Sequence, residues 1–194
     1  MVHALCSTKK KMEKTISEIR KEFFAFRNGV LATRLRESGD PHAVIMGCLL
    51  ADVVSIVRRY EPSVELAEAL WADVKHRECR LAAPMLFPPS EMEREQAMEW
   101  ARGVQSEEEA DVLCHRLLRR VTGAEEMACE LMASDVRLEQ YAGLRLLMNL
   151  LVAGRLENHD AVRAALEQSA LKVWPENARL LKEVEEDSEL AFGN

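Results

Sequence analysis

The stretch from residue 107 to 120 holds the densest set of side chains that could do chemistry. Asp111 stands one helical turn before His115. Three arginines follow at helical spacing: Arg116, Arg119 and Arg120. The carboxylate is either aimed into a groove, or it is an acidic residue favoured by the helix dipole and paired with His115. The arginines either align to hold phosphate, or form a solvated face with salt bridges to nearby glutamates.

Other charged residues repeat this pattern earlier in the chain. Arg77 and Arg80 lie at helical spacing, and Arg58-Arg59 precede them. Each group of arginines lies near the end or face of one helix, so stacking of successive helices could align the groups into one stripe that binds phosphates. Alternatively, each group is a solvated helix face. The N-terminal segment is also basic. It could contact DNA, or it could be a solubilising terminus. Its lysines are Lys9, Lys10, Lys11 and Lys14.

A metal site is not indicated by the cysteines and histidines. Cys114-His115 and the pair Cys79 and His76 lack the spacing of a zinc site, and cysteine on an apolar helical face belongs to the core. Trp71 and Trp100 stand on amphipathic faces and are also expected in the core. No glycine-rich phosphate loop or hydrolase motif is present, so no cofactor is expected.

The composition predicts that these side chains stand on helices. Hydrophobic residues make up 48% and charged residues 30%, while only 8 Gly and 6 Pro occur among 194 residues. Leu, Ala, Glu, Arg and Met, which are good helix formers, dominate. A soluble, all-α chain follows.

Apolar spacings of three and four residues, separated by Gly, Pro and Ser, mark about ten helices. The first is expected over 8–27, interrupted at Asn28-Gly29 and resumed over 30–36. The others are expected at 49–60, 63–74, 76–86, 90–104, 106–121, 125–133, 136–153, 160–173 and 176–184. Ser63 is expected to cap its helix, and Ser90 and Ser106, each with a glutamate three residues later, are expected to form capping boxes. The pattern predicts one domain over residues 1–194, an α-α superhelix of about five HEAT/ARM-like helix pairs, with a frayed acidic tail from about residue 185. A compact bundle is the competing architecture.

The net charge and the cysteine content limit which partners and which cellular compartment are expected. The net charge of −7 argues against binding a polyanion by bulk electrostatics, although residues 1–39 carry nine Lys/Arg against four Asp/Glu. Five scattered cysteines without a CxxC pair predict reduced thiols and a cytoplasmic protein. No apolar run reaches the roughly 18 residues that a membrane span needs, and no signal peptide is recognised.

Several stretches resemble the DNA alkylation repair (AlkD-like) family. The strongest are the segment from Leu66 to Trp71 and the segment from His76 to Leu86, which are similar to a helix pair of that family. The segments 92–100 and 111–114 resemble the helices that follow, and the likeness covers about residues 20–153. It implies a HEAT-like fold that holds DNA in a basic groove and excises alkylated bases, with no cofactor. An aspartate stabilises the developing cation, tryptophans flank the lesion, and an arginine grips phosphate.

Carried over to this chain, the family's aspartate falls on Asp111. Its tryptophan four residues earlier falls on Glu107, and its arginine falls near Gln140 or Tyr141, before Ala142-Gly143. Trp174 stands where a later tryptophan could be. One of the three key positions is therefore retained.

The resemblance thus implies a divergent, repair-related DNA-binding protein, with base excision disfavoured by the two departures. Asp111 is the candidate catalytic residue if the chain is a DNA N-glycosylase. The candidate nucleic-acid contacts are Arg77, Arg80, Arg116, Arg119 and Arg120, with double-stranded DNA as the partner. The alternative, favoured by the net charge and by Glu107, is a non-catalytic HEAT-like scaffold that binds a protein or peptide.

Overall fold

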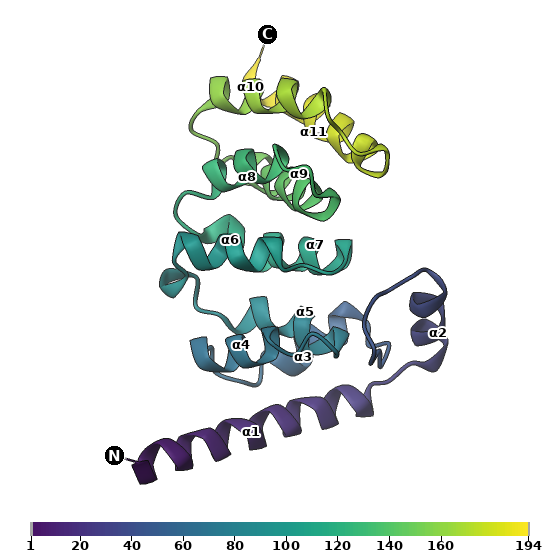
Figure 1. Ribbon diagram of the computed structural model, residues 1–194, viewed down its shortest axis with the longest axis vertical. Coiled ribbons are helices and arrows are strands. Elements are labelled where there is room, and N and C mark those ends of the chain that lie inside the picture. The colour runs from purple at the N-terminus through teal and green to yellow at the C-terminus, as the bar shows by residue number, and fades with distance from the viewer. Residues whose placement is uncertain (1, 194) are drawn as a thin grey trace. The chain divides into compact units, whose positions relative to one another are not determined.

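The structure, a computed structural model, describes the backbone of residues 2–193 and the side chains of residues 10–193. Cys6 and Lys9 therefore lie outside the described side chains. Across this range the chain forms α-helices joined by short turns and 3₁₀ segments, with one isolated backbone bridge and no strand (Figure 1). The all-α class predicted from the sequence is confirmed. The helices gather into two compact units, Met1–Glu91 and Met92–Asn194, and each is described by itself.

Unit 1 contains a long first helix and four shorter ones. They are α1 (Val2–Ala25), α2 (Gly29–Glu37), α3 (Leu50–Val57), α4 (Val64–Trp71) and α5 (Arg77–Leu86), followed by a 3₁₀ turn at Pro89–Glu91. The helices α4 and α5 pack as a pair, α3 lies on α5, and α1 covers α3 and α4. Ile19, Phe23, Ile56 and Leu70 are fully buried where these helices meet. Burial of such side chains supplies the main favourable term for this unit.

An extended segment between α2 and α3 is fastened to the start of α5. Val44 pairs with His76 in the isolated bridge, and Gly47 takes a φ of 77°. A Cβ on Gly47 would lie 2.3 Å from the carbonyl oxygen of Asn28, so both the left-handed backbone and the close approach require glycine there. The segment is held by the buried carboxylate of Glu78, which faces its backbone.

Unit 2 contains three successive helix pairs that form layers in Figure 1. The first is α6 (Arg94–Arg102) with α7 (Glu107–Arg116), followed by a 3₁₀ turn at Leu118–Arg120. The second is α8 (Ala124–Met132) with α9 (Arg137–Val152). The third is α10 (His159–Ala170) with α11 (Ala178–Phe192), and a 3₁₀ turn at Pro175–Asn177 lies between them.

Helix α9 is the centre of unit 2. It packs against α7, α8 and α11, and its buried residues lie around most of its circumference. Such an all-round burial was expected from its apolar sequence. Gly143 allows the backbone of α8 to pass close by, because a Cβ there would lie 2.5 Å from the amide nitrogen of Met132.

Two predicted helix starts are confirmed and one is wrong. The hydroxyl oxygens of Ser63 and Ser106 accept hydrogen bonds from the first-turn amides of α4 and α7. Ser90 does not cap α6, because it lies inside the 3₁₀ turn that follows Pro88, and Glu93 precedes the helix instead.

The structure continues α11 through the acidic tail as far as Phe192, and Ser188 is buried within that tail.

Candidate nucleic-acid interface

A row of polar side chains joins α7 to α9 within unit 2. The residues meet in order along both helices: Glu107 with Arg137, Asp111 with Tyr141 and Arg145, and His115 with Asn149. The residue numbers rise together on the two sides, so α7 and α9 run parallel, as equivalent helices of successive repeats do. We call this set the α7–α9 row.

Asp111 stands in the middle of the α7–α9 row, and one of its carboxylate oxygens contacts two side chains of α9. Its Oδ1 lies 2.6 Å from Nε of Arg145 and accepts a hydrogen bond of 2.9 Å from the Tyr141 hydroxyl. A guanidinium nitrogen of Arg145 also donates to the Tyr141 hydroxyl at 3.0 Å. Burial raises the pKa of the Asp111 carboxyl, although Arg145 and Tyr141 act in the opposite direction. The predicted Asp111–His115 pair does not form, because His115 faces Asn149 instead.

The arginines after His115 are the unpaired part of this surface. Arg116 and Arg119 are half-buried and Arg120 is exposed. Within residues 10–193, none of the three forms an ion pair with a carboxylate. Burial first, and then Arg119, Arg116 and Arg120, lower the pKa of His115, so the three cations lie near its ring. We call these three arginines the arginine cluster.

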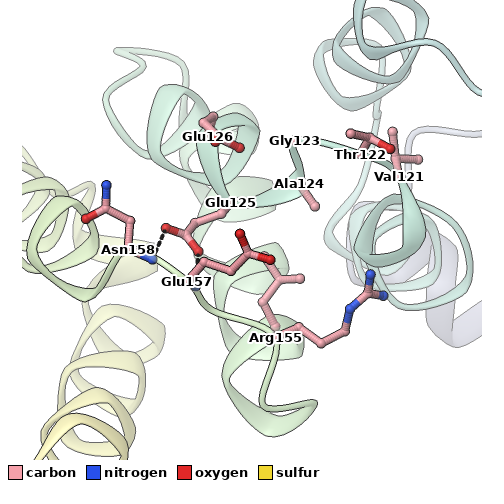
Figure 2. A pocket seen from close by; sticks show the side chains of 10 residues that line it. Val121, Thr122, Gly123, Ala124, Glu125, Glu126, Arg155, Glu157 and Asn158 are labelled. Atoms are coloured by element: carbon pink, nitrogen blue, oxygen red, sulfur yellow. Dashed lines mark hydrogen bonds between the residues drawn. The ribbon is translucent and has the colours of Figure 1, made fainter.

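A cavity of about 600 Å³ lies beyond the arginine cluster, between the start of α8 and the turn after α9 (Figure 2). The Glu125 carboxylate accepts hydrogen bonds there from the backbone amides of Glu157 and Asn158, at 2.7 and 3.0 Å. The guanidinium of Arg155 lies on the Val121 side of the cavity, away from Glu125, and donates to the carbonyl oxygen of Arg119. Because Glu125, Glu126 and Glu157 outnumber its one arginine, this cavity repels phosphate and bounds the basic surface.

The prediction that Arg77 and Arg80 hold phosphate does not agree with their burial. Each is 2% exposed. Arg77 donates to Glu78 and to the carbonyl oxygen of Cys48, while Arg80 lies 3.3 Å over the Trp71 ring and donates to its carbonyl oxygen. Both arginines therefore serve the interior of unit 1.

We expect Arg80→Lys to lower the free energy of unfolding of unit 1 by about 2 kcal/mol, because lysine keeps the charge but loses the planar stack on Trp71 and the fixed donor geometry. Urea unfolding followed by circular dichroism measures the loss, and amide hydrogen exchange assigns it to unit 1. Arg58→Lys, at an exposed position of the same unit, is the control. If Arg80→Lys instead left stability intact and weakened DNA binding, Arg80 would belong to the binding surface.

The other basic residues lie on exposed surfaces of unit 1. Lys10 and Lys11 are exposed on α1, and Lys14 forms an ion pair with Glu18 at 3.8 Å. Arg58 is exposed, whereas Arg59 pairs with Glu22. Trp71 and Trp100 are buried, as predicted.

Sequence reasoning missed the arginine that accompanies Asp111. It sought that residue at Gln140 or Tyr141, but Gln140 is buried and binds Asn177, and Arg145 reaches the carboxylate from one turn further along α9. Trp174 is 41% exposed, and its indole N–H donates to the carbonyl oxygen of Asp135 just before α9.

Among the described residues, no group of three or more His, Cys, Asp or Glu side chains is arranged to hold a metal ion. None of the described helices is long and apolar enough to cross a membrane.

Comparison with known proteins shows similarity at the level of the fold. No family model matches the chain, and no curated protein matches it. A solved structure matches over 89% of this chain and 82% of its own length, with a TM-score of 0.61 and 16% sequence identity. That protein belongs to a new family related to the HEAT-like repeat DNA glycosylases, with affinity for branched DNA structures. The match agrees with the HEAT-like fold that the sequence resemblance implied.

Proposed function

We propose that this chain binds DNA through the arginine cluster at the end of the α7–α9 row and does not excise bases. One contrast carries the proposal. The candidate catalytic carboxylate, Asp111, is already bound by Arg145 and Tyr141, whereas Arg116, Arg119 and Arg120 have no carboxylate partner among the described residues. The cations are thus available to an external anion, whereas one oxygen of the carboxylate is already held by Arg145 and Tyr141.

The arginine cluster suits the phosphate backbone rather than the bases. Guanidinium groups bind phosphate oxygens by paired, charge-assisted hydrogen bonds. No Phe, Tyr or Trp stands between His115 and Arg120, so along this stretch the imidazole of His115 is the one ring beside the arginines. Backbone contacts of this kind recognise the shape of DNA more than its sequence. The affinity of the structurally similar protein for branched DNA supports a branched or double-stranded DNA ligand.

Base excision requires negative charge aimed at the sugar as it becomes cationic. Arg145, at 2.6 Å, neutralises the carboxylate of Asp111. Glu107, where the resembling family carries a tryptophan, pairs with Arg137 at 2.5 Å and provides no stacking surface. Both features support binding without excision.

The test compares three DNA ligands: an alkylated duplex, the same duplex unmodified, and a four-way junction. We expect no released base, equal affinity for both duplexes, and tighter binding to the junction. Base release by the wild-type chain that is abolished in Asp111→Asn would contradict the proposal. Absence of DNA binding at any salt concentration would instead favour the protein-binding scaffold.

Asp111→Asn is expected to increase DNA affinity several-fold. Removal of the carboxylate leaves Arg145 unneutralised and raises the local positive potential. Stability should change by less than about 1 kcal/mol, because the side chains of Arg145 and Asp111 are 31% and 43% exposed. Fluorescence anisotropy with a labelled duplex measures the affinity, and Asp187→Asn on the outer face of α11 is the control. A loss of affinity in Asp111→Asn would assign the carboxylate a direct part in binding.

A further inference from the structure

A second cavity, in unit 1, combines a flat aromatic surface with free positive charge. It has a volume of about 550 Å³ and lies where α1 turns into α2. Phe24, Arg27, Gly29 and Arg36 line it, together with the apolar residues Ile45 and Met46. No Asp or Glu is among its lining residues, although the chain carries a net charge of −7. We call it the α1–α2 cavity.

The aromatic wall of the α1–α2 cavity is exposed and already carries a stacked cation. Phe24 is 56% exposed, and the guanidinium carbon of Arg27 lies 4.2 Å from the centre of its ring. Arg27 also donates to the carbonyl oxygen of Phe24 at 3.0 Å, which holds its plane in place. A benzyl ring and a guanidinium are the flat surfaces on which nucleic-acid bases stack.

The two arginines keep donors for an anion. Arg36 donates one N–H to the carbonyl oxygen of Ile45 at 3.0 Å, and Arg27 donates one to Phe24. Neither arginine forms an ion pair with a carboxylate within residues 10–193, so each has further N–H groups available for phosphate oxygens. The cavity volume lies within the roughly 300–1,000 Å³ of small-ligand sites.

We propose that the α1–α2 cavity binds an unpaired nucleotide of a nucleic-acid strand, with the base against Phe24 and Arg27 and the phosphate at Arg27 and Arg36. This site differs in kind from the arginine cluster, whose stretch from Arg116 to Arg120 contains no Phe, Tyr or Trp. It does not depend on the function proposed for unit 2, because all of its residues belong to unit 1.

The probe is a fluorescein-labelled oligothymidylate of about twelve nucleotides, with a blunt duplex of the same length as reference. The full chain is titrated into each and the anisotropy is recorded. Phe24→Ala should weaken binding of the single strand about tenfold, through loss of base stacking, and leave the duplex unchanged. Phe26→Ala is the matched control, since that ring is 46% exposed two residues away but does not line the cavity.

A second variant fills the cavity and leaves its lining side chains in place. A Cβ at Gly29 would meet no atom within 4 Å, and leucine is a better helix former than glycine at this start of α2. Gly29→Leu should therefore abolish single-strand binding at the cavity while the thermal midpoint stays equal or rises. Unfolding cannot explain such a pair of results.

Three outcomes would overturn the proposal. If Phe26→Ala lost as much affinity for the single strand as Phe24→Ala, the binding would depend on exposed apolar surface in general and not on this cavity. Wild-type binding of the strand by Gly29→Leu would place the ligand elsewhere. Competition by deoxythymidine monophosphate as strong as that by the oligonucleotide would replace the strand with a free nucleotide as the ligand. Loss of duplex binding alone would concern the arginine cluster, so failures of the two proposals are distinguishable.

Discussion

Glu78→Ala is expected to lower the free energy of unfolding of unit 1 by about 3–5 kcal/mol. The Glu78 carboxylate is 0% exposed and accepts hydrogen bonds from the backbone amides of Met46, Gly47 and Cys48 at 3.2, 2.9 and 3.3 Å. It also compensates the buried guanidinium of Arg77 at 3.0 Å. Alanine leaves the three amides without this acceptor and the cation without its nearest carboxylate, and each such change is costly in the interior.

Urea unfolding of the two proteins provides the measurement, and amide hydrogen exchange locates the change. We expect loss of protection to begin at residues 46–48, since these are the amides that lose their acceptor. Glu37→Ala, an exposed carboxylate at the end of α2, should change stability by less than about 0.5 kcal/mol. Equal stability of Glu78→Ala and Glu37→Ala would contradict the assigned role of the buried carboxylate.

Gly143→Ala is expected to destabilise unit 2 by about 3 kcal/mol. The added Cβ would lie 2.5 Å from the amide nitrogen of Met132, 2.8 Å from the carbonyl oxygen of Ala128 and 2.9 Å from the carbonyl carbon of Leu131. These are backbone atoms of α8, so no flexible side chain can move aside. The methyl group would force α8 and α9 apart and disturb the packing of both.

The same substitution at Gly29 is the control, because a Cβ there meets nothing within 4 Å and alanine favours the helix. Gly29→Ala should leave stability unchanged or slightly raised, whereas Gly143→Ala lowers the thermal midpoint by several degrees. Retention of wild-type stability in Gly143→Ala would contradict the close approach of α8 and α9 at this glycine.

The helix pairs could be predicted from the sequence because local signals specify them. Apolar periodicity and the serines before α4 and α7 depend only on neighbouring residues. The role of Glu78 could not be predicted, since the amides that it binds lie about thirty residues earlier in an extended segment. The burial of Arg80 escaped prediction for a related reason. Helical spacing places a side chain on a face, but Trp71 of the partner helix determines that this face is covered.

The candidate site could be predicted only where its residues are neighbours in the sequence. The sequence identified Asp111 and the arginine cluster, both on one continuous stretch. It did not identify Arg145, because contact between α7 and α9 depends on how two helices about thirty residues apart align. The same alignment determines that His115 faces Asn149 rather than Asp111.

The salt dependence of DNA binding tests the central claim most directly. The measurement compares the wild-type chain with the triple variant Arg116→Gln, Arg119→Gln, Arg120→Gln on a labelled four-way junction. Removal of one arginine–phosphate interaction should reduce the slope of log K against log salt by about 0.9. The matched control removes the same charge from cations that already have carboxylate partners on the α10–α11 side: Lys172→Gln, Arg179→Gln and Lys182→Gln. We predict a slope lower by about 2–3 and affinity at least about tenfold weaker in the first variant only. Equal losses of affinity in both variants, or wild-type binding without salt dependence, would contradict DNA binding through the arginine cluster.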